Sequence, residues 1–145
     1  MQQQEQILVL DFGGQYSQLI ARRIRETKVY SSILPYNVDI NKIKELNPSG
    51  IVFSGGPKSV TLAEAPKIDP RVFELGIPIL GICYGMQLMA ETLTGGEVEK
   101  AQYGEYGKAK IDILDNEGIF AEIDNSQVWM SHGDHVKKVP DGFII

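Results

Sequence analysis

A single cysteine carries the clearest chemical signal in this sequence. Cys83 lies in a glycine-x-cysteine-x-glycine segment, residues 81–85, which follows the apolar residues 77–80 and opens a stretch with helical spacing of apolar side chains. A nucleophile on such a sharp strand-to-helix turn is typical of acyl-transfer enzymes. A helix N-terminus also favours the thiolate form of a cysteine. We therefore predict that Cys83 is a catalytic nucleophile; the alternative is a structural cysteine that packs as a small hydrophobic side chain.

An acyl-transfer nucleophile needs N–H groups that stabilise a developing oxyanion. The N–H of Tyr84, directly after the nucleophile, is one expected donor. The second is expected from the pair Gly55 and Gly56 after the short apolar run 51–53, although this pair is also typical of a tight turn. Residues 54–59 are not expected to form a phosphate loop, because they lack the glycine that a Walker A pattern has before its lysine.

Other polar side chains are open to more than one interpretation. Gln87 falls one helical turn after Cys83, where its neutral amide is suited to bind a polar substrate, but its spacing is equally typical of a solvent-facing residue. His132 and His135 flank Asp134, and we expect no metal there, because the one cysteine is already assigned and the chain has no other histidine. Either histidine is a candidate base. The preferred interpretation of this segment is a strand-end turn whose backbone contacts the ligand.

Alternating strand and helix patterns must position these residues. The expected strands cover residues 7–10, 29–34, 51–53 and 77–80, the expected helices cover residues 16–27, 40–46, 70–75 and 84–94, and residues 58–68 are expected to be loop. The last helix is expected to bury Met86, Met89, Ala90 and Leu93 and to stop at Gly95 and Gly96. This order predicts an α/β, three-layer, doubly wound, mostly parallel sheet. Right-handed crossovers then bring the turns after the strands to one ligand-binding edge.

The second half of the chain has a different pattern. Residues 97–101, 108–114 and 126–130 predict half-exposed strands, and the period-2 alternation of the middle one indicates an antiparallel extension of the domain. We expect Trp129 in the core and residues 142–145 in a further strand.

Composition excludes several classes of protein. With 145 residues, 43% of them hydrophobic and 23% charged, the chain fits one globular domain, and its one cysteine rules out an intramolecular disulfide. A net charge of -5 disfavours a nucleic-acid partner. Residues 1–6 are polar, unlike a secretory signal, and no apolar stretch approaches a membrane span. We expect a cytoplasmic domain, residues 1–145, with no membrane and no nucleic-acid partner.

Four segments give the sequence a specific family resemblance. Residues 81–87 together with residues 54–57 resemble the class I (triad) glutamine amidotransferases. Residues 9–23 and 130–134 narrow the resemblance to the N-terminal glutaminase domains of that family that feed GMP formation, and the match spans nearly the whole chain. The resemblance implies a flavodoxin-like fold with a cysteine nucleophile elbow.

The resemblance also implies a reaction. It is the hydrolysis of L-glutamine to glutamate and ammonia through a thioester on Cys83, with the N–H groups of Gly56 and Tyr84 as the oxyanion hole. The glutamine-holding positions of the family map to Gln87, Ser131, Gly133 and Asp134. No metal or cofactor is implied in this domain. The ammonia would pass to an ATP-pyrophosphatase (synthetase) domain or subunit that uses ATP and Mg to convert XMP to GMP.

The family completes its triad with a His-x-Glu pair downstream of segment 130–134, and this sequence contains none. We therefore expect the C-terminal part of the domain to lie outside these 145 residues and the chain alone to be inactive. Two other hypotheses stay open: a catalytically incomplete glutamine-binding or regulatory module, and another cysteine-elbow hydrolase or peptidase.

Overall fold

A parallel sheet of four strands forms the centre of the molecule in the computed structural model, which describes residues 4–145. The strands are β1 (Gln6–Asp11), β2 (Tyr30–Pro35), β3 (Gly50–Phe53) and β4 (Ile79–Gly81). They confirm the four strands predicted from the sequence, and they pair in the order β2-β1-β3-β4. Residues 1–3, within the N-terminal segment predicted not to be a signal, lie outside the described residues. The strand order is that of flavodoxin-like folds, whose ligands bind where the order reverses, between β1 and β3.

The connections contain the predicted helices. They are α1 (Ser17–Glu26), α2 (Ile40–Leu46), the 3-10 helix η1 (Pro70–Glu74) and α3 (Tyr84–Thr92). The carboxylates of Asp39 and Asp69 accept hydrogen bonds from the first free N–H groups of α2 and η1, which is why these short helices begin where they do. Residues 58–68 form the predicted loop. In the described part of the chain, every helix is too short or too polar to cross a membrane.

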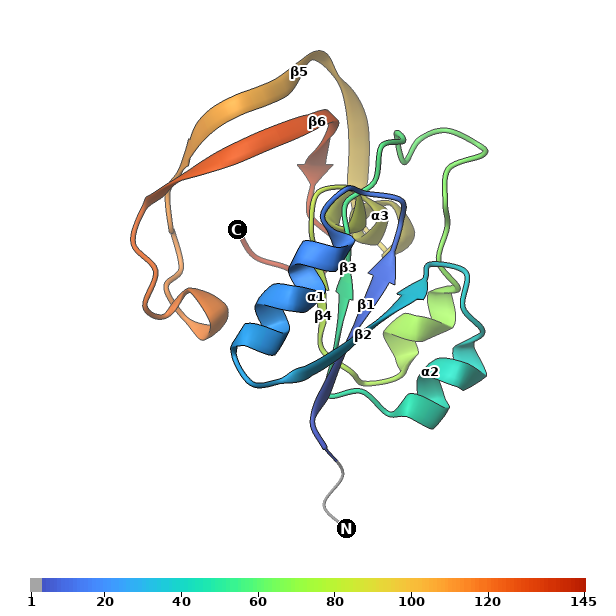
Figure 1. Ribbon diagram of the computed structural model, residues 1–145. Coiled ribbons are helices and arrows are strands. Elements are labelled where there is room, and N and C mark those ends of the chain that lie inside the picture. The colour runs from blue at the N-terminus through green and yellow to red at the C-terminus, as the bar shows by residue number, and fades with distance from the viewer. Residues whose placement is uncertain (1–3) are drawn as a thin grey trace.

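Helices cover both faces of the sheet (Figure 1). Because successive side chains of a strand point to opposite faces, Leu8 and Leu10 of β1 join the core cluster that includes α2, η1 and α3. Val9 lies on the other face and packs with Ala21 of α1 and Val52 of β3. The three-layer α/β class predicted from the sequence is confirmed.

Helix α3 buries most of the predicted face, since Met89 and Ala90 are buried and Leu93 packs against the core, but Met86 is not part of it. Met86 was expected inside but is 44% exposed, whereas Gln87 is only 3% exposed. The elbow explains this difference: Gly81 lies so close to the backbone of Met86 that a Cβ atom at Gly81 would come within 2.7 Å of it. The orientation of the first turn is therefore set by the backbone contact. Ala90 is buried as expected, and the helix ends before the glycines predicted to stop it.

The antiparallel extension is confirmed as a long two-stranded ribbon of β5 (Glu97–Ile111) and β6 (Ser126–Lys138), with the 3-10 helix η2 (Gly118–Phe120) in its connection. Figure 1 shows the ribbon arching away from the parallel sheet. Residues 131–135 belong to β6, so the predicted strand-end turn is wrong. The irregularity lies in the partner strand, where residues 101–104 bulge between the paired positions Lys100 and Glu105.

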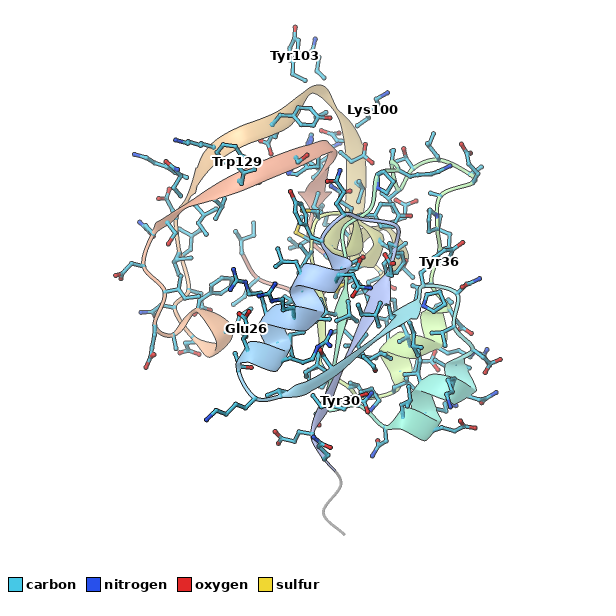
Figure 2. All side chains as sticks on the ribbon, viewed as in Figure 1. Glu26, Tyr30, Tyr36, Lys100, Tyr103 and Trp129 are labelled. Atoms are coloured by element: carbon cyan, nitrogen blue, oxygen red, sulfur yellow. The ribbon has the colours of Figure 1, made fainter. Side chains whose placement is uncertain are left out.

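Two expectations for the second half are also wrong. Trp129 is 69% exposed rather than in the core. It pairs with Lys108 on the face of the ribbon turned away from the half-buried Val128 and Met130, and Figure 2 shows it on the ribbon, apart from the sheet. A lone tryptophan in a strand has no sequence signal for which face it takes, because a shift of one residue reverses inside and outside. Residues 142–145 are exposed and form no strand.

Candidate active site

Cys83 sits in a sharp turn between β4 and α3. Its backbone angles are φ 50° and ψ -110°, in the positive-φ region that residues with a side chain rarely adopt. The residue is the N-cap of α3, and its side chain is half-buried. The nucleophile elbow predicted from the sequence is therefore present, and the strained residue is the cysteine itself.

Two hydrogen bonds fasten the elbow to the end of β3. The N–H of Ile82 donates to Phe53 O at 3.0 Å, and the N–H of Gly85 donates to Ser54 O at 3.2 Å. Gly85 permits this contact, because a Cβ atom there would lie 2.5 Å from Phe53 O and 2.6 Å from Phe53 Cβ. Neither Gly81 nor Gly85 has a positive φ. These glycines are needed for space, not for an unusual backbone conformation.

The exit of β3 is ordered by a residue that the sequence analysis passed over. Ser54 is fully buried; its Oγ accepts a hydrogen bond from the N–H of Phe12 at 3.0 Å and donates to Gly55 O at 2.9 Å. In a trans peptide the C=O and N–H point in opposite directions. Because Ser54 holds the carbonyl of the Gly55–Gly56 peptide, the N–H of Gly56 points away from the Ser54 hydroxyl. A serine directly after a buried strand and before two glycines was the available sequence signal.

The structure brings this glycine pair against the elbow. A Cβ atom on Gly55 would lie 3.7 Å from Cys83 Cβ, and one on Gly56 would lie 3.3 Å from Tyr84 Cγ. The N–H of Tyr84 is the first amide of α3, and such amides have no partner within their helix. Both predicted oxyanion donors thus lie on segments that border the nucleophile.

The side chain of Tyr84 has a structural task. Its ring packs 5.5 Å from that of Phe12, and its hydroxyl donates to Pro66 O in the loop after β3. Burial raises the pKa of Tyr84 to about 12, so the phenol stays protonated and keeps this hydrogen bond.

Gln87 is buried rather than solvent-facing, which excludes the alternative raised by its spacing. Its Nε2 donates to the main-chain oxygen of Asp134 at 3.0 Å, so α3 and β6 meet one turn after Cys83. Asp134 itself is 4% exposed. Ser131 is exposed, whereas Gly133 is half-buried opposite the bulge of β5. Of the four glutamine-holding positions implied by the resemblance, the structure joins Gln87 and Asp134 by a direct bond.

The electrostatics of the thiol differ from the expectation. Burial raises the pKa of the Cys83 thiol, whereas the helix N-terminus alone was expected to lower it. The two histidines are engaged along the ribbon: His132 Nε2 lies 3.4 Å from Glu105 and its Nδ1 lies 2.8 Å from Asp134 O, while His135 Nε2 lies 3.0 Å from Glu99. The thiol therefore depends on a base to become a thiolate near neutral pH.

Two features outside the elbow, within residues 4–145, form no site for a metal ion or a substrate. Across residues 4–145, no three His, Cys, Asp or Glu side chains converge in a way that could hold a metal ion. A shallow hollow on the surface of α1 is lined by Gln18, Arg22, Arg25 and Glu26. It includes none of the residues of the elbow, and its cations are already paired or bonded within the helix.

The fold, the Cys83 turn and the Gly55–Gly56 segment after β3 are together typical of one protein family. The sequence model of the class-I glutamine amidotransferases matches residues 8–145, and the chain belongs to this family.

The chain is similar in sequence to proteins named GMP synthase. The chain is 68% identical over 140 residues to a GMP synthase [glutamine-hydrolyzing] of Halothermothrix orenii, covering 97% of this chain and 28% of that protein. It is 59% identical to the protein of the same name from Carboxydothermus hydrogenoformans, of which it covers 27%. The chain thus spans just over a quarter of the length of these relatives. Among solved structures, a GMP synthase subunit from Thermoplasma acidophilum superimposes with a TM-score of 0.76 at 33% identity, covering 97% of this chain and 71% of that one.

The raised pKa gives a testable reactivity for Cys83. Only the thiolate reacts with iodoacetamide, so we expect slow alkylation at pH 7 and a rate that rises with pH through a midpoint above the ordinary ~8.5 of a free cysteine. Mass spectrometry of the modified chain at a series of pH values measures this profile. A midpoint below ~8.5 would show that the helix N-terminus outweighs burial.

The space at Gly85 gives a second prediction. Gly85→Ala forces a methyl group against the backbone of Phe53, and we expect it to lower the free energy of unfolding by roughly 1–3 kcal/mol or more, as overpacking does. Gly133→Ala is the matched control, because a Cβ atom there would meet nothing closer than 3.9 Å. Urea titration compares the two variants; equal stabilities would mean that the elbow is not packed on β3 as described.

Proposed function

We propose that this chain carries the nucleophilic half of a glutaminase, which hydrolyses L-glutamine to glutamate and ammonia through a thioester on Cys83. The observation that carries the proposal is the position of the strained Cys83 elbow against the glycine exit of β3. Membership in the class-I glutamine amidotransferase family supports the choice of glutamine over the substrates of other cysteine-elbow hydrolases.

The chemistry follows from the groups at the elbow. The Cys83 thiolate attacks the amide carbon of glutamine, and the C=O electrons move onto oxygen, where the N–H groups of Gly56 and Tyr84 stabilise the charge. The C–N bond then breaks, the nitrogen takes up a proton and leaves as ammonia, and a thioester remains. Water attacks the thioester with loss of a proton to a base, and glutamate leaves as the thiolate re-forms.

We propose that Gln87, Ser131, Gly133 and Asp134 hold the substrate, as the family resemblance implies. The bond from Gln87 Nε2 to Asp134 O supports this for Gln87, because it fixes the orientation of the amide and leaves its oxygen to accept from a substrate N–H. The exposure of Ser131 is compatible with contact through its hydroxyl or its backbone.

The general base is proposed to come from polypeptide outside residues 1–145, so that these residues form one incomplete glutamine amidotransferase domain. The chain has two histidines and both are engaged in the β5–β6 ribbon, with no His-x-Glu segment in the sequence. The solved relative from Thermoplasma acidophilum is longer than the matched part, which supports the same proposal. A catalytically incomplete binding or regulatory module is not favoured by the names of the relatives.

The ammonia is proposed to be used by an ATP-pyrophosphatase (synthetase) domain or subunit, which needs ATP and Mg and converts XMP to GMP in the cytoplasm. The name of the relatives, GMP synthase [glutamine-hydrolyzing], supports this assignment, and so does their length. Residues 54–59 are unsuited to phosphate, and within residues 4–145 no metal-binding cluster is formed. We propose that ATP and Mg are used by the synthetase domain or subunit, and we propose no cofactor, nucleic-acid or membrane partner for this domain.

A trapping experiment tests the proposed function. We expect 6-diazo-5-oxo-L-norleucine to alkylate Cys83 faster than its D-enantiomer does. The ketone of this glutamine analogue takes the place of the amide carbonyl, and its diazomethyl carbon takes up a proton and forms the C–S bond as N₂ leaves. We expect the 145-residue chain to release no ammonia catalytically from glutamine. Extending the chain through a His-x-Glu segment should restore turnover, and Cys83→Ala should abolish it. Equal rates for the two enantiomers would remove the proposed glutamine pocket. Catalytic turnover by the unextended chain, lost in His132→Ala or His135→Ala, would show that a ribbon histidine is the base.

The oxyanion donor at Gly56 is better tested through Ser54 than directly. A Cβ atom at Gly56 would lie 2.7 Å from Phe12 O, so the obvious Gly56→Pro change would also disturb the fold. Ser54→Ala frees the Gly55 carbonyl, and we expect the rate of L-diazo-oxonorleucine alkylation at saturation to fall by roughly tenfold or more.

The matched control is Ser31→Ala, which removes another buried hydroxyl with a bond to a main-chain oxygen, that of Ala21. Both variants should lose stability, by roughly 1–3 kcal/mol for an unsatisfied buried group, but only Ser54→Ala should lose reactivity. Equal reactivity of the two variants would mean that Ser54 has no effect on the oxyanion donor.

A further inference from the structure

Asp134 is the point at which three parts of the site meet. Its Oδ2 accepts hydrogen bonds from Ser59 Oγ at 2.5 Å and from the N–H of Val60 at 3.1 Å, both in the loop after β3. Its main-chain oxygen accepts from Gln87 Nε2 at 3.0 Å and lies 2.8 Å from His132 Nδ1. The residue joins the loop, helix α3 and strand β6.

The hydrogen bonds of Asp134 hold the loop after β3, which has no regular secondary structure of its own. The loop that begins with the oxyanion segment contains no helix or strand between β3 and η1, so its own hydrogen-bond ladder cannot hold it. Ser54 fixes its beginning, through Phe12 and Gly55. Asp134 fixes it again five residues later, at a separation of 75 residues along the chain. Gly56 lies between these two anchors.

Burial makes the Asp134 contact strong. A carboxylate that is 4% exposed is costly unless it is hydrogen-bonded, and bonds to an ionised acceptor are about twice as strong as neutral ones. Lys67, in the same loop, donates to Val60 O at 2.6 Å rather than to the carboxylate. The charge of Asp134 is thus directed at the donors of the loop.

We propose that Asp134 is a positioning residue of the oxyanion hole: through Ser59 and Val60 it holds the loop that presents the N–H of Gly56 to the substrate carbonyl. This inference rests on the proposed glutaminase function and adds a second role to the contact with glutamine that the resemblance gives Asp134. Displacing an oxyanion donor destabilises the transition state more than it destabilises the bound substrate. We therefore expect a lower rate of the chemical step and little change in substrate affinity.

Ser59→Ala is the decisive variant, because Ser59 has no proposed contact with substrate. We expect the saturating rate of Cys83 alkylation by 6-diazo-5-oxo-L-norleucine to fall roughly tenfold, with the half-saturating concentration changed less than about twofold. Thiol reactivity toward iodoacetamide, which needs no oxyanion hole, should not change. Thr61→Ala is the matched control: it removes a hydroxyl of the same loop that contacts Ser59 but not Asp134.

Two substitutions of Asp134 complete the series. Asp134→Ala should lower the saturating rate at least as much as Ser59→Ala, and combining the two should add little, because both break one contact. Asp134→Asn keeps an oxygen that can accept both loop donors and should lose less than Asp134→Ala. Circular dichroism and urea titration identify any variant that does not fold, in which case Ser59→Ala alone decides.

The outcomes separate the two proposals. A wild-type chain that does not distinguish the L- from the D-analogue would remove the proposed function itself. If the wild type is stereoselective, any of three results would overturn the positioning role and leave the proposed glutaminase intact. In the first, Ser59→Ala alkylates at the wild-type rate. In the second, Ser59→Ala and Thr61→Ala lose equally, and in the third Ser59→Ala changes only the half-saturating concentration.

Discussion

The site depends on the docking of one strained turn onto the end of a neighbouring strand. A residue with a side chain at φ 50° costs on the order of 1–3 kcal/mol, and Cys83 adopts this conformation. The bonds from Ile82 and Gly85 to the end of β3 each contribute roughly 0.5–1.5 kcal/mol net, so together they are comparable with that cost. The same two bonds place the nucleophile beside the peptide that follows β3. The strained residue, the proposed nucleophile and the proposed oxyanion donors are therefore brought together by one contact.

This contact presents the thiol but does not ionise it. Half-burial raises the pKa of the Cys83 thiol, so the turn itself does not favour the thiolate. His132 and His135 face Glu105 and Glu99 along the ribbon instead. The division is chemically reasonable, because an uncharged thiol is protected from unwanted alkylation until a base is brought to it. The described residues therefore supply the proposed acylation site, and proton transfer is proposed to fall to another group.

Sequence pattern was sufficient for features that are local. The apolar run of β1 and the glycines around Cys83 predicted a buried parallel strand and the elbow, because buried parallel strands and sharp turns have local signatures. Contacts between distant residues had no such signature. The bond between Ser59 and Asp134 spans 75 residues, and nothing in the sequence pairs them. Trp129 was misplaced for a related reason: alternation in a ribbon with one half-exposed face identifies two faces but does not say which one the body of the protein covers.

The strand order also explains a glycine turn that has no chemistry of its own. Residues 13–15 follow β1 at the switch point, where ligands of such folds bind, yet they match no dinucleotide fingerprint. Gly14 lies directly against the backbone of Gly55, leaving no room there for a Cβ atom, and Gly13 has φ 91°. The turn after β1 thus packs behind the oxyanion segment, while the Ser54 hydroxyl joins the two through Phe12. In this fold the switch-point turn therefore packs against the Gly55 peptide, which lies beside the Cys83 elbow.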